Sequence, residues 1–266
     1  MTRPRARALV LALVLVGVMA AGGCPTEEPA VGRLVFADGF DGTTLSTARW
    51  GTCHWWGPTG CTILTNDELE WYQPSQVTVR DGLLRLTADH GSVDAHGRHF
   101  PYVSGMVSSG RAGDEPQHLP RFAFTYGRVE VRFRIPRGAG TWPAIWMLPA
   151  TNATLPEIDL LEVRGQTPDL PSMTLHPTTG ARQRREVRTA DLSTGWHIVT
   201  LDWAPQKLVW SIDGVERFRV TGAAVPREPM YLVANLAIGG DAGDPGPTTP
   251  FPSRFLIDRV KVWALP

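Results

Sequence analysis

The sequence predicts an all-β fold, a sandwich or barrel of short antiparallel strands in a single domain. Alternating or apolar runs of strand length are separated by clusters of Gly, Pro, Asn and Asp, and no stretch keeps a helical period. The composition agrees with this, because 27 Gly, 23 Pro and 10 Trp suit a loop-rich β protein with aromatic faces. A chain of 266 residues lies within the size range of one all-β domain.

The N-terminus has the layout of an export signal over residues 1–23, which are therefore not part of the fold. Three arginines precede a short apolar run, and Gly22-Gly23 follows it before Cys24. This ending resembles a bacterial lipoprotein processing site, with Cys24 as the lipidated residue and residues 24–32 as a tether. The alternative is ordinary signal cleavage that leaves Cys24 as a stray thiol. The signal leads us to expect an exported protein, either secreted or held at the membrane by its lipid. We do not expect the apolar run to cross the membrane, because it is short for a span of about 20 residues.

Cys53 and Cys61 remain as an even pair if Cys24 carries lipid, so we expect a disulfide in an oxidising compartment. The bond would close a Trp-rich loop over residues 53–61. Zinc is disfavoured, since Cys53, His54 and Cys61 lack a second pair of ligands at finger-like spacing.

The clearest strand is residues 129–135, in which apolar residues alternate with Glu130 and Arg132. The other expected elements differ in pattern but are equally short. They are two strands of a hairpin around Asp213-Gly214 (208–212 and 216–220), an almost wholly apolar central strand (230–237), a loop over one rim (239–252) and a final strand (255–263).

The final strand contains an anomaly at Asp258. Strict alternation puts this carboxylate on the same face as Leu256, Val260 and Val262, so it would point toward the core. An inward charge needs a partner. The sequence is compatible both with hydrogen-bonded or Arg-paired Asp258 and with a Ca²⁺ ion held by oxygen ligands.

The charge balance excludes several classes of partner. Lys+Arg and Asp+Glu number 26 each and no basic run is present, so no net field attracts nucleic acid or an anionic surface. We therefore expect an uncharged partner and no nucleic acid. Tryptophan faces suit flat, weakly polar surfaces such as sugar rings.

The chemistry is concentrated in residues 157–162, where Glu157, Asp159 and Glu162 are interleaved with apolar residues. This pattern predicts a strand with Glu157 and Asp159 on one face, but strict alternation would bury Glu162 unpaired on the other. We therefore predict a β-bulge at Leu160-Leu161, which returns Glu162 to the face of Glu157.

The bulge also sets the expected distance between the two glutamates. Their Cα atoms would lie roughly 13 Å apart, and side chains that lean inward would bring the carboxyl groups to about 5–6 Å. That separation is typical of a retaining glycosidase, in which one carboxylate is the nucleophile and the other carboxyl group is the acid. Asp159 between them would push their pKa values apart. Taken alone, the run is equally compatible with a solvated strand face.

Two tryptophans just upstream favour a sugar-binding site. Residues 140–149 predict a strand with Trp142 and Trp146 on one face, where they can stack on successive sugar rings. An isolated pair of tryptophans is more often ordinary core, so the pair gains its meaning from the acidic strand beside it.

Together these motifs resemble glycoside hydrolase family 16, the laminarinase-like group, over residues 36–263. The resemblance rests on the acidic and Trp-rich runs and on five further segments, which are residues 66–72, 102–105, 126–132, 235–240 and 258–263. It implies a concanavalin A-like jelly-roll β-sandwich of two curved antiparallel sheets, with a concave groove that binds a polysaccharide lengthwise. Residues 33–266 would then form the catalytic domain.

Carried over by position, the resemblance makes Glu157 the nucleophile, Glu162 the general acid/base and Asp159 a helper. It implies contacts with substrate from a set of polar and aromatic residues, namely Asn66, Glu130, Arg132, Trp142, Trp146, His176 and Asn235. It also matches Asp258 and a backbone carbonyl of the Asp81-Gly82 turn to a structural Ca²⁺ site, which favours calcium as the partner of Asp258. No cofactor is implied for catalysis.

The implied activity is retaining endo-hydrolysis of a β-linked polysaccharide by a monomer, with β-1,3-glucan favoured. Hydrolysis of another β-glycan, such as mixed-linkage glucan or galactan, stays open, and so does transglycosylation through the same glycosyl-enzyme intermediate. A noncatalytic glycan-binding surface lipoprotein is a third alternative, which the presence of both Glu157 and Glu162 disfavours.

Overall fold

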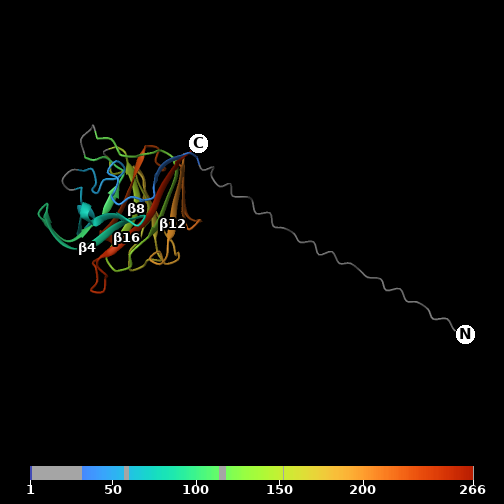
Figure 1. The fold of residues 1–266 in the computed structure, drawn as a ribbon. Helices are drawn as coiled ribbons and strands as arrows, with labels where there is room; N and C mark the ends of the chain where they lie inside the picture. The colour runs from blue at the N-terminus through green and yellow to red at the C-terminus, as the bar shows by residue number, and fades with distance from the viewer. Residues whose placement is uncertain (2–31, 57–59, 114–117, 152, 266) are drawn as a thin grey trace.

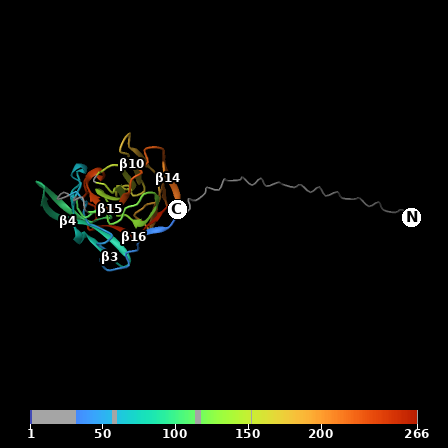
Figure 2. The ribbon, with the colours of Figure 1, turned by 90° about the horizontal axis from the view of Figure 1, so that it is seen from above.

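The computed structural model describes residue 1 and residues 32–265, except 57–59, 114–117 and 152. Cys24 and nearly all of the expected signal and tether lie outside the described residues. Within the described part, the chain forms two β-sheets that pack against each other (Figures 1 and 2), together with three short 3₁₀ turns and no α-helix. The prediction of an all-β fold is confirmed. None of the described segments is a helix long and apolar enough to cross a membrane.

The larger sheet has ten strands in the order β14-β13-β12-β7-β16-β4-β5-β2, with β1 paired to β16 and β3 paired to β4. Neighbours are antiparallel except β2 and β5, which are parallel. The strands are β1 (Leu34–Asp38), β2 (Glu70–Tyr72), β3 (Val77–Arg80), β4 (Leu83–Ala95), β5 (Arg98–Ser104), β7 (Gly127–Arg134), β12 (His197–Ala204), β13 (Lys207–Ile212), β14 (Val215–Thr221) and β16 (Ser253–Ala264).

The smaller sheet has six antiparallel strands in the order β11-β10-β9-β8-β15-β6. They are β6 (Met106–Ser108), β8 (Thr141–Pro149), β9 (Glu157–Glu162), β10 (Ser172–His176), β11 (Gln183–Glu186) and β15 (Met230–Ile238). The 3₁₀ turns are η2 (Leu64–Asn66), η3 (Pro74–Gln76) and η4 (Gly240–Ala242). The last of these lies in the predicted rim loop.

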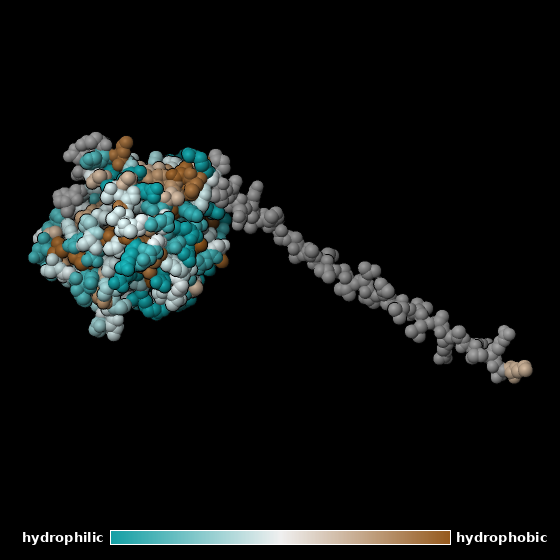
Figure 3. Space-filling model, viewed as in Figure 1, coloured by the Kyte–Doolittle hydropathy of each residue, from teal (hydrophilic) through white to brown (hydrophobic). Residues whose placement is uncertain are grey.

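The main hydrophobic core lies between the two sheets. Val131 and Phe133 of β7 enter it from the larger sheet, and Ile158 and Leu161 of β9 enter it from the smaller one. The polar residues of β7 alternate with the buried ones, as a strand with one face on the core requires. On the outside, the face of the molecule seen in Figure 3 is mostly hydrophilic, with small scattered hydrophobic areas.

The smaller sheet is also covered on its second face, near β8 and β15. Every residue of β15 is buried, because a separate hydrophobic cluster packs against the side of this strand that faces away from the main core. The members of this cluster are Trp55, Tyr72, Met106, Ala144, Trp146, Leu148, Tyr231 and Val233. The prediction of a central apolar strand is confirmed, and this second cluster explains why its pattern does not alternate.

The predicted hairpin is formed by β13 and β14, which pair across Asp213-Gly214. Both turn residues have positive φ, 52° for Asp213 and 75° for Gly214. A two-residue hairpin turn of this kind requires such backbone angles, which Asp and Gly tolerate best.

Candidate active site

Strand β9 contains a β-bulge in the middle of the acidic run. In its pairing with β8, Asp159 lies opposite Trp146 and Leu161 lies opposite Ile145, so Leu160 is an extra residue. The pairing of β9 with β10 is irregular at the same place. The bulge predicted at Leu160-Leu161 is therefore confirmed.

The bulge sorts the side chains of β9 between the core and a cleft. Leu160 and Leu161 are both fully buried in the main core. Glu157, Asp159 and Glu162 all line a cleft of about 780 Å³ instead. Without the extra residue, Glu162 would point into the core, where an unpaired carboxylate is costly.

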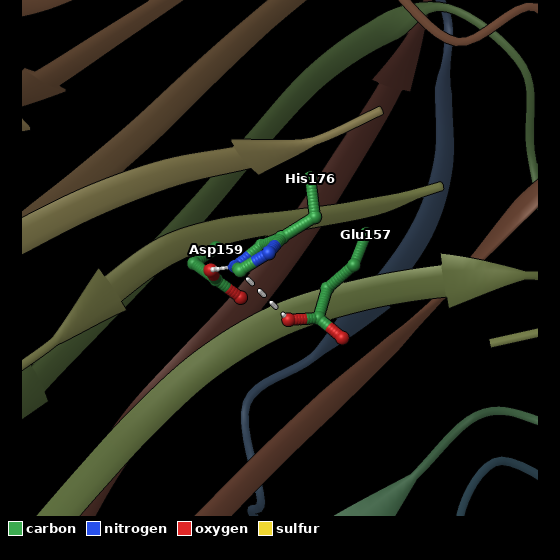
Figure 4. A group of neighbouring side chains, drawn as sticks. All are labelled: Glu157, Asp159 and His176. Carbon is green, nitrogen blue, oxygen red and sulfur yellow. Dashed lines mark hydrogen bonds and ion pairs between the residues drawn. The ribbon is translucent and has the colours of Figure 1, made fainter. Parts of the chain in front are cut away.

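His176 contacts two of the three carboxyl groups, as Figure 4 shows. Its Nε2 lies 3.1 Å from Asp159 Oδ2 and 3.5 Å from Glu157 Oε1. His176 reaches them from β10, where it pairs with Glu157 across the strands. Because Asp159 is only 3% exposed, an N–H donated by His176 satisfies a buried carboxylate and fixes its position beside Glu157.

Glu157, Asp159 and His176 also form a group that could hold a metal ion. Among the described residues, it is the only such group of three or more His, Cys, Asp or Glu side chains. Their ligand atoms lie within 4.8 Å of one another. The hydrogen bond from His176 to Asp159 already accounts for this close approach.

Glu162 lies among hydroxyl groups and beside a cation. Its Oε2 accepts hydrogen bonds of 3.4 Å from Ser172 Oγ and Thr174 Oγ1. Burial and the nearby Asp159 raise the pKa of Glu162 to about 8, although the positive charge of Arg184 acts in the opposite direction. Glu162 is thus protonated at neutral pH, which is the state that a general acid needs.

The pKa of Glu157 is also raised well above its usual range, by burial and by repulsion from Asp159 and Glu162. Asp159 therefore raises the pKa of both glutamates, whereas we expected it to push the two values apart. Carboxyl groups this close titrate together, because ionisation of one raises the pKa of the others. The cluster consequently holds a proton at neutral pH and offers both an acid and a base.

Trp142 and Trp146 both line the cleft from β8, on one face of the strand as predicted. The indole of Trp146 is fixed by a hydrogen bond, in which its Nε1 donates to Asn235 Oδ1 at 2.8 Å. Asn235 Nδ2 in turn donates to the hydroxyl oxygen of Tyr72 at 2.9 Å. Asn235 lines the cleft and at the same time orients Trp146.

Asn66 lines the cleft from η2, and its side-chain amide donates to Glu68 Oε1 at 3.0 Å. Glu68 is another cleft residue, and burial raises its pKa. The sequence could have predicted Glu68 as a cleft residue, because it lies in the same motif as Asn66, residues 66–72. Trp56, Arg184 and Asp241 also line the cleft. Trp56 lies in the expected Trp-rich loop and Asp241 in the expected rim loop, but no pattern in the sequence places these three side chains in the cleft.

Glu130 and Arg132 lie outside the cleft, which corrects their expected role in substrate binding. Both are on β7 in the larger sheet, on the face that points away from the core. Glu130 accepts a hydrogen bond of 3.1 Å from Arg259 Nε. Arg132 pairs with Asp258 at 2.9 Å and lies over the ring of Trp196. The alternation of this strand was predicted correctly, but its polar face is turned to the far side of the molecule.

Asp258 is paired with arginine, as one of the two alternatives had it, but it does not point into the core, which corrects the expected direction of its side chain. A bulge in β16 between Ile257 and Arg259 turns Asp258 onto the polar face of the larger sheet. Its Oδ1 lies 2.9 Å from Arg132 Nη1, and its Oδ2 accepts from Arg259 Nη1 at 3.1 Å. Two guanidinium groups beside this carboxylate do not fit a Ca²⁺ site. Gly82, the other expected member, lies in the turn between β3 and β4 with a φ of 69°.

The expected disulfide between Cys53 and Cys61 is present. The backbone of the loop is attached beside the cleft, since the N–H of Tyr72 donates to the carbonyl oxygen of Cys61 at 2.7 Å. The side chain of Trp56, inside this loop, reaches the cleft itself.

The cleft thus brings Glu157 and Glu162 together with Trp142 and Trp146. Residues 65–251 match the sequence model of glycosyl hydrolases family 16. The chain belongs to this family. Family 16 enzymes need no cofactor for catalysis.

Several known proteins are similar to most of this chain. Endo-1,3-1,4-beta-glycanase ExsH of Rhizobium meliloti is 34% identical over 248 residues, which cover 86% of this chain and 51% of ExsH. The beta-glucanase of Rhodothermus marinus is 28% identical, with 97% of this chain and 94% of that protein covered. The catalytic domain of an endo-1,3-beta-glucanase (laminarinase) from Thermotoga petrophila has a TM-score of 0.76 at 26% identity, over 87% of this chain and 97% of that one. The expected jelly roll is confirmed, and the chain spans about half the length of relatives such as ExsH.

Proposed function

We propose that the chain is a retaining endo-hydrolase of a β-linked glucan, with β-1,3 linkages preferred. The observation that carries the proposal is the bulge in β9, which brings Glu157, Asp159 and Glu162 to one cleft lined with tryptophan. An open cleft formed from several strands suits an internal stretch of a polysaccharide. The names of ExsH and of the Thermotoga petrophila laminarinase support β-glucan as the substrate class.

In the proposed reaction, Glu157 is the nucleophile and Glu162 is the general acid. Glu162 gives its proton to the glycosidic oxygen while a carboxylate oxygen of Glu157 attacks the anomeric carbon, so that the leaving sugar departs with a hydroxyl group. Glu162, now ionised, takes a proton from a water molecule. That water attacks the anomeric carbon and releases Glu157. Two inversions at the same carbon give net retention.

Asp159 and His176 influence the charges of the two glutamates in this reaction. Repulsion from Asp159 helps to keep the proton on Glu162 before the first step. The Nε2 of His176, at 3.5 Å from Glu157 and 3.1 Å from Asp159, places a donor beside the carboxylate that must attack. Asp159 thereby favours the protonated form of Glu162, and the donor from His176 favours the ionised form of Glu157.

The test is reducing-sugar release from laminarin, mixed-linkage glucan and galactan. Glu157→Gln and Glu162→Gln should each lose about 10³-fold or more in kcat. Glu130→Gln is a matched control, because this glutamate lies on the far face of the larger sheet and should retain activity. Azide should restore turnover to Glu157→Ala and yield a glycosyl azide of inverted configuration.

Several results would contradict the proposal. Net inversion by the unmodified enzyme would exclude Glu157 as a nucleophile. Release of sugar from galactan alone would replace the glucan with another β-glycan. Binding of a glucan without turnover of any substrate would favour a noncatalytic binding protein.

We also propose that the chain is exported, acts as a monomer and is held at the membrane by lipid on Cys24. The disulfide between Cys53 and Cys61 supports export, since such bonds persist in oxidising compartments. The N-terminal sequence supports the lipid.

A further inference from the structure

The disulfide-closed loop packs onto the sheet that carries the active site. Trp55 from this loop is 8% exposed and belongs to the second hydrophobic cluster, together with Trp146 of β8 and Tyr231 of β15. This cluster anchors the loop over the β8 and β15 side of the sheet. The cleft is lined by side chains of β8 and β15, such as Trp146 and Asn235, and by those of β9 and β10. The described residues of the loop, 53–56 and 60–61, therefore form a wall at one side of the cleft.

Trp56 presents part of its ring to the cleft from this wall. Its ring stacks on His54, with centroids 4.0 Å apart and an angle of 10° between the planes, and meets the edge of Trp55 at 5.9 Å. His54 in turn lies 5.6 Å from the ring of Trp146. Two ring contacts, both made by His54, thus connect Trp56 with Trp146, which lies opposite Asp159 in the sheet. An indole supported in this way is rigid, so little entropy is lost when a ligand stacks on it.

The support beneath Trp56 is uncharged. His54 is 6% exposed, and burial lowers its pKa to about 3. The imidazole is therefore neutral at the pH where Glu162 is protonated, and it neither attracts an anion nor repels a cation. Ile63 and Leu64 line the cleft close to this loop. The surface is suited to the apolar face of a sugar ring.

We propose that Trp56 forms a sugar-binding subsite at the loop side of the cleft, outside the catalytic residues, and that the disulfide holds it there. This inference deepens the proposed function and rests on it. Trp56 is connected with Trp146 through His54, so a sugar ring on Trp56 occupies a different position from one on Trp146, and only chains with sugar units for both positions gain from the contact. The subsite therefore makes the enzyme select long glucan chains over short ones.

The experiment compares kcat/KM for β-1,3-gluco-oligosaccharides of increasing length and for laminarin. Trp56→Ala should lose about tenfold on the long substrates and little on the shortest cleaved one, whereas Trp56→Phe should keep most of the wild-type preference. Trp71→Ala is the matched control, since Trp71 also stacks on a histidine, His96, but is not among the residues that line the cleft. A Cys53→Ser, Cys61→Ser double variant should show the same selective loss on long chains.

An equal loss at every chain length, or no loss at any length, would overturn the subsite. Calorimetric binding of a long β-1,3-gluco-oligosaccharide to Glu157→Gln, with and without Trp56→Ala, gives an independent readout that does not need turnover. Equal Kd values for the two proteins would also overturn it. If the unmodified enzyme hydrolyses none of the glucans, the proposed function fails, and the calorimetric arm still decides whether Trp56 binds them.

Discussion

The substitution Trp210→Phe tests whether the bulge in β9 depends on a hydrogen bond from the opposite sheet. Trp210 is fully buried in β13, and its Nε1 donates to the backbone oxygen of Asp159 at 2.9 Å. In a regular strand the carbonyl groups point sideways to neighbouring strands. A carbonyl that accepts from the facing sheet therefore marks a backbone turned by the bulge. Phe keeps an aromatic ring at this position and removes the donor.

The expected cost follows from the burial of both partners. A buried acceptor left without its donor costs about 1–3 kcal/mol, and the smaller ring leaves unfilled volume, so the free energy of unfolding should fall by about 2–4 kcal/mol. If the backbone at Asp159 relaxes, Glu162 no longer lies in place beside Glu157. A tenfold fall in kcat corresponds to about 1.4 kcal/mol in the activation free energy, and we expect at least this loss.

Trp203→Phe separates this effect from general loss of stability. Trp203 is 1% exposed in β12 of the same sheet, and its Nε1 donates to the carbonyl oxygen of Pro226 at 3.1 Å, away from β9. Urea unfolding should show similar destabilisation of both variants, whereas kcat on laminarin, measured where both proteins are folded, should fall only in Trp210→Phe. Equal kcat values for the two variants would refute the role of Trp210 in holding the bulge.

Four further predictions concern other parts of the molecule. Because the pKa of Glu162 is raised from 4.5 to about 8, its contribution to stability is complete below the lower value and is lost as pH rises toward the higher one. Glu162→Gln should therefore unfold at a higher temperature than wild type, by a margin that grows from about pH 5 to about pH 9, and a margin independent of pH would contradict this. The wild-type kcat/KM should fall above about pH 8 as the acid ionises. Arg132→Ala should leave kcat/KM on laminarin within about twofold of wild type, since its side chain lies on the far face of the larger sheet; a large rise in KM would return it to the substrate site. EDTA should leave the unfolding temperature unchanged, because Asp258 is paired with two arginines; a drop that CaCl₂ reverses would speak for calcium. Cys24→Ser should move the protein from the membrane fraction to the soluble fraction, and continued fractionation with membranes would count against the lipid.

Much of the active site could be predicted because its decisive residues are close together in the sequence. Glu157, Asp159 and Glu162 lie on one strand, so strand geometry and the cost of burying a charge are enough to place them. Trp56, Arg184 and Trp210 reach the same region from three separate segments. Their positions depend on the order of strands in the sheets and on loop packing, which the periodicity of a strand does not reveal.

The face assigned to Glu130 shows a different limit. Alternation in β7 correctly separated its polar side chains from its buried ones. A sandwich, however, has two outward faces, and alternation cannot tell which of them carries the cleft. Only the order of the strands decides this, since β7 lies between β12 and β16 in the larger sheet and β9 lies in the smaller one.

Asp258 and Glu162 posed the same physical problem, a carboxylate that strict alternation directs into the core. In β9 we predicted an extra residue, and in β16 we considered a counter-ion or Ca²⁺ for an inward carboxylate. The chain uses a bulge in both places. The insertion in β16 turns Asp258 outward to Arg132 and Arg259, and the insertion in β9 turns Glu162 into the cleft. One extra residue costs a strand little, whereas a buried unpaired charge costs far more, so a bulge should be the first interpretation of an inward charge in an otherwise alternating strand.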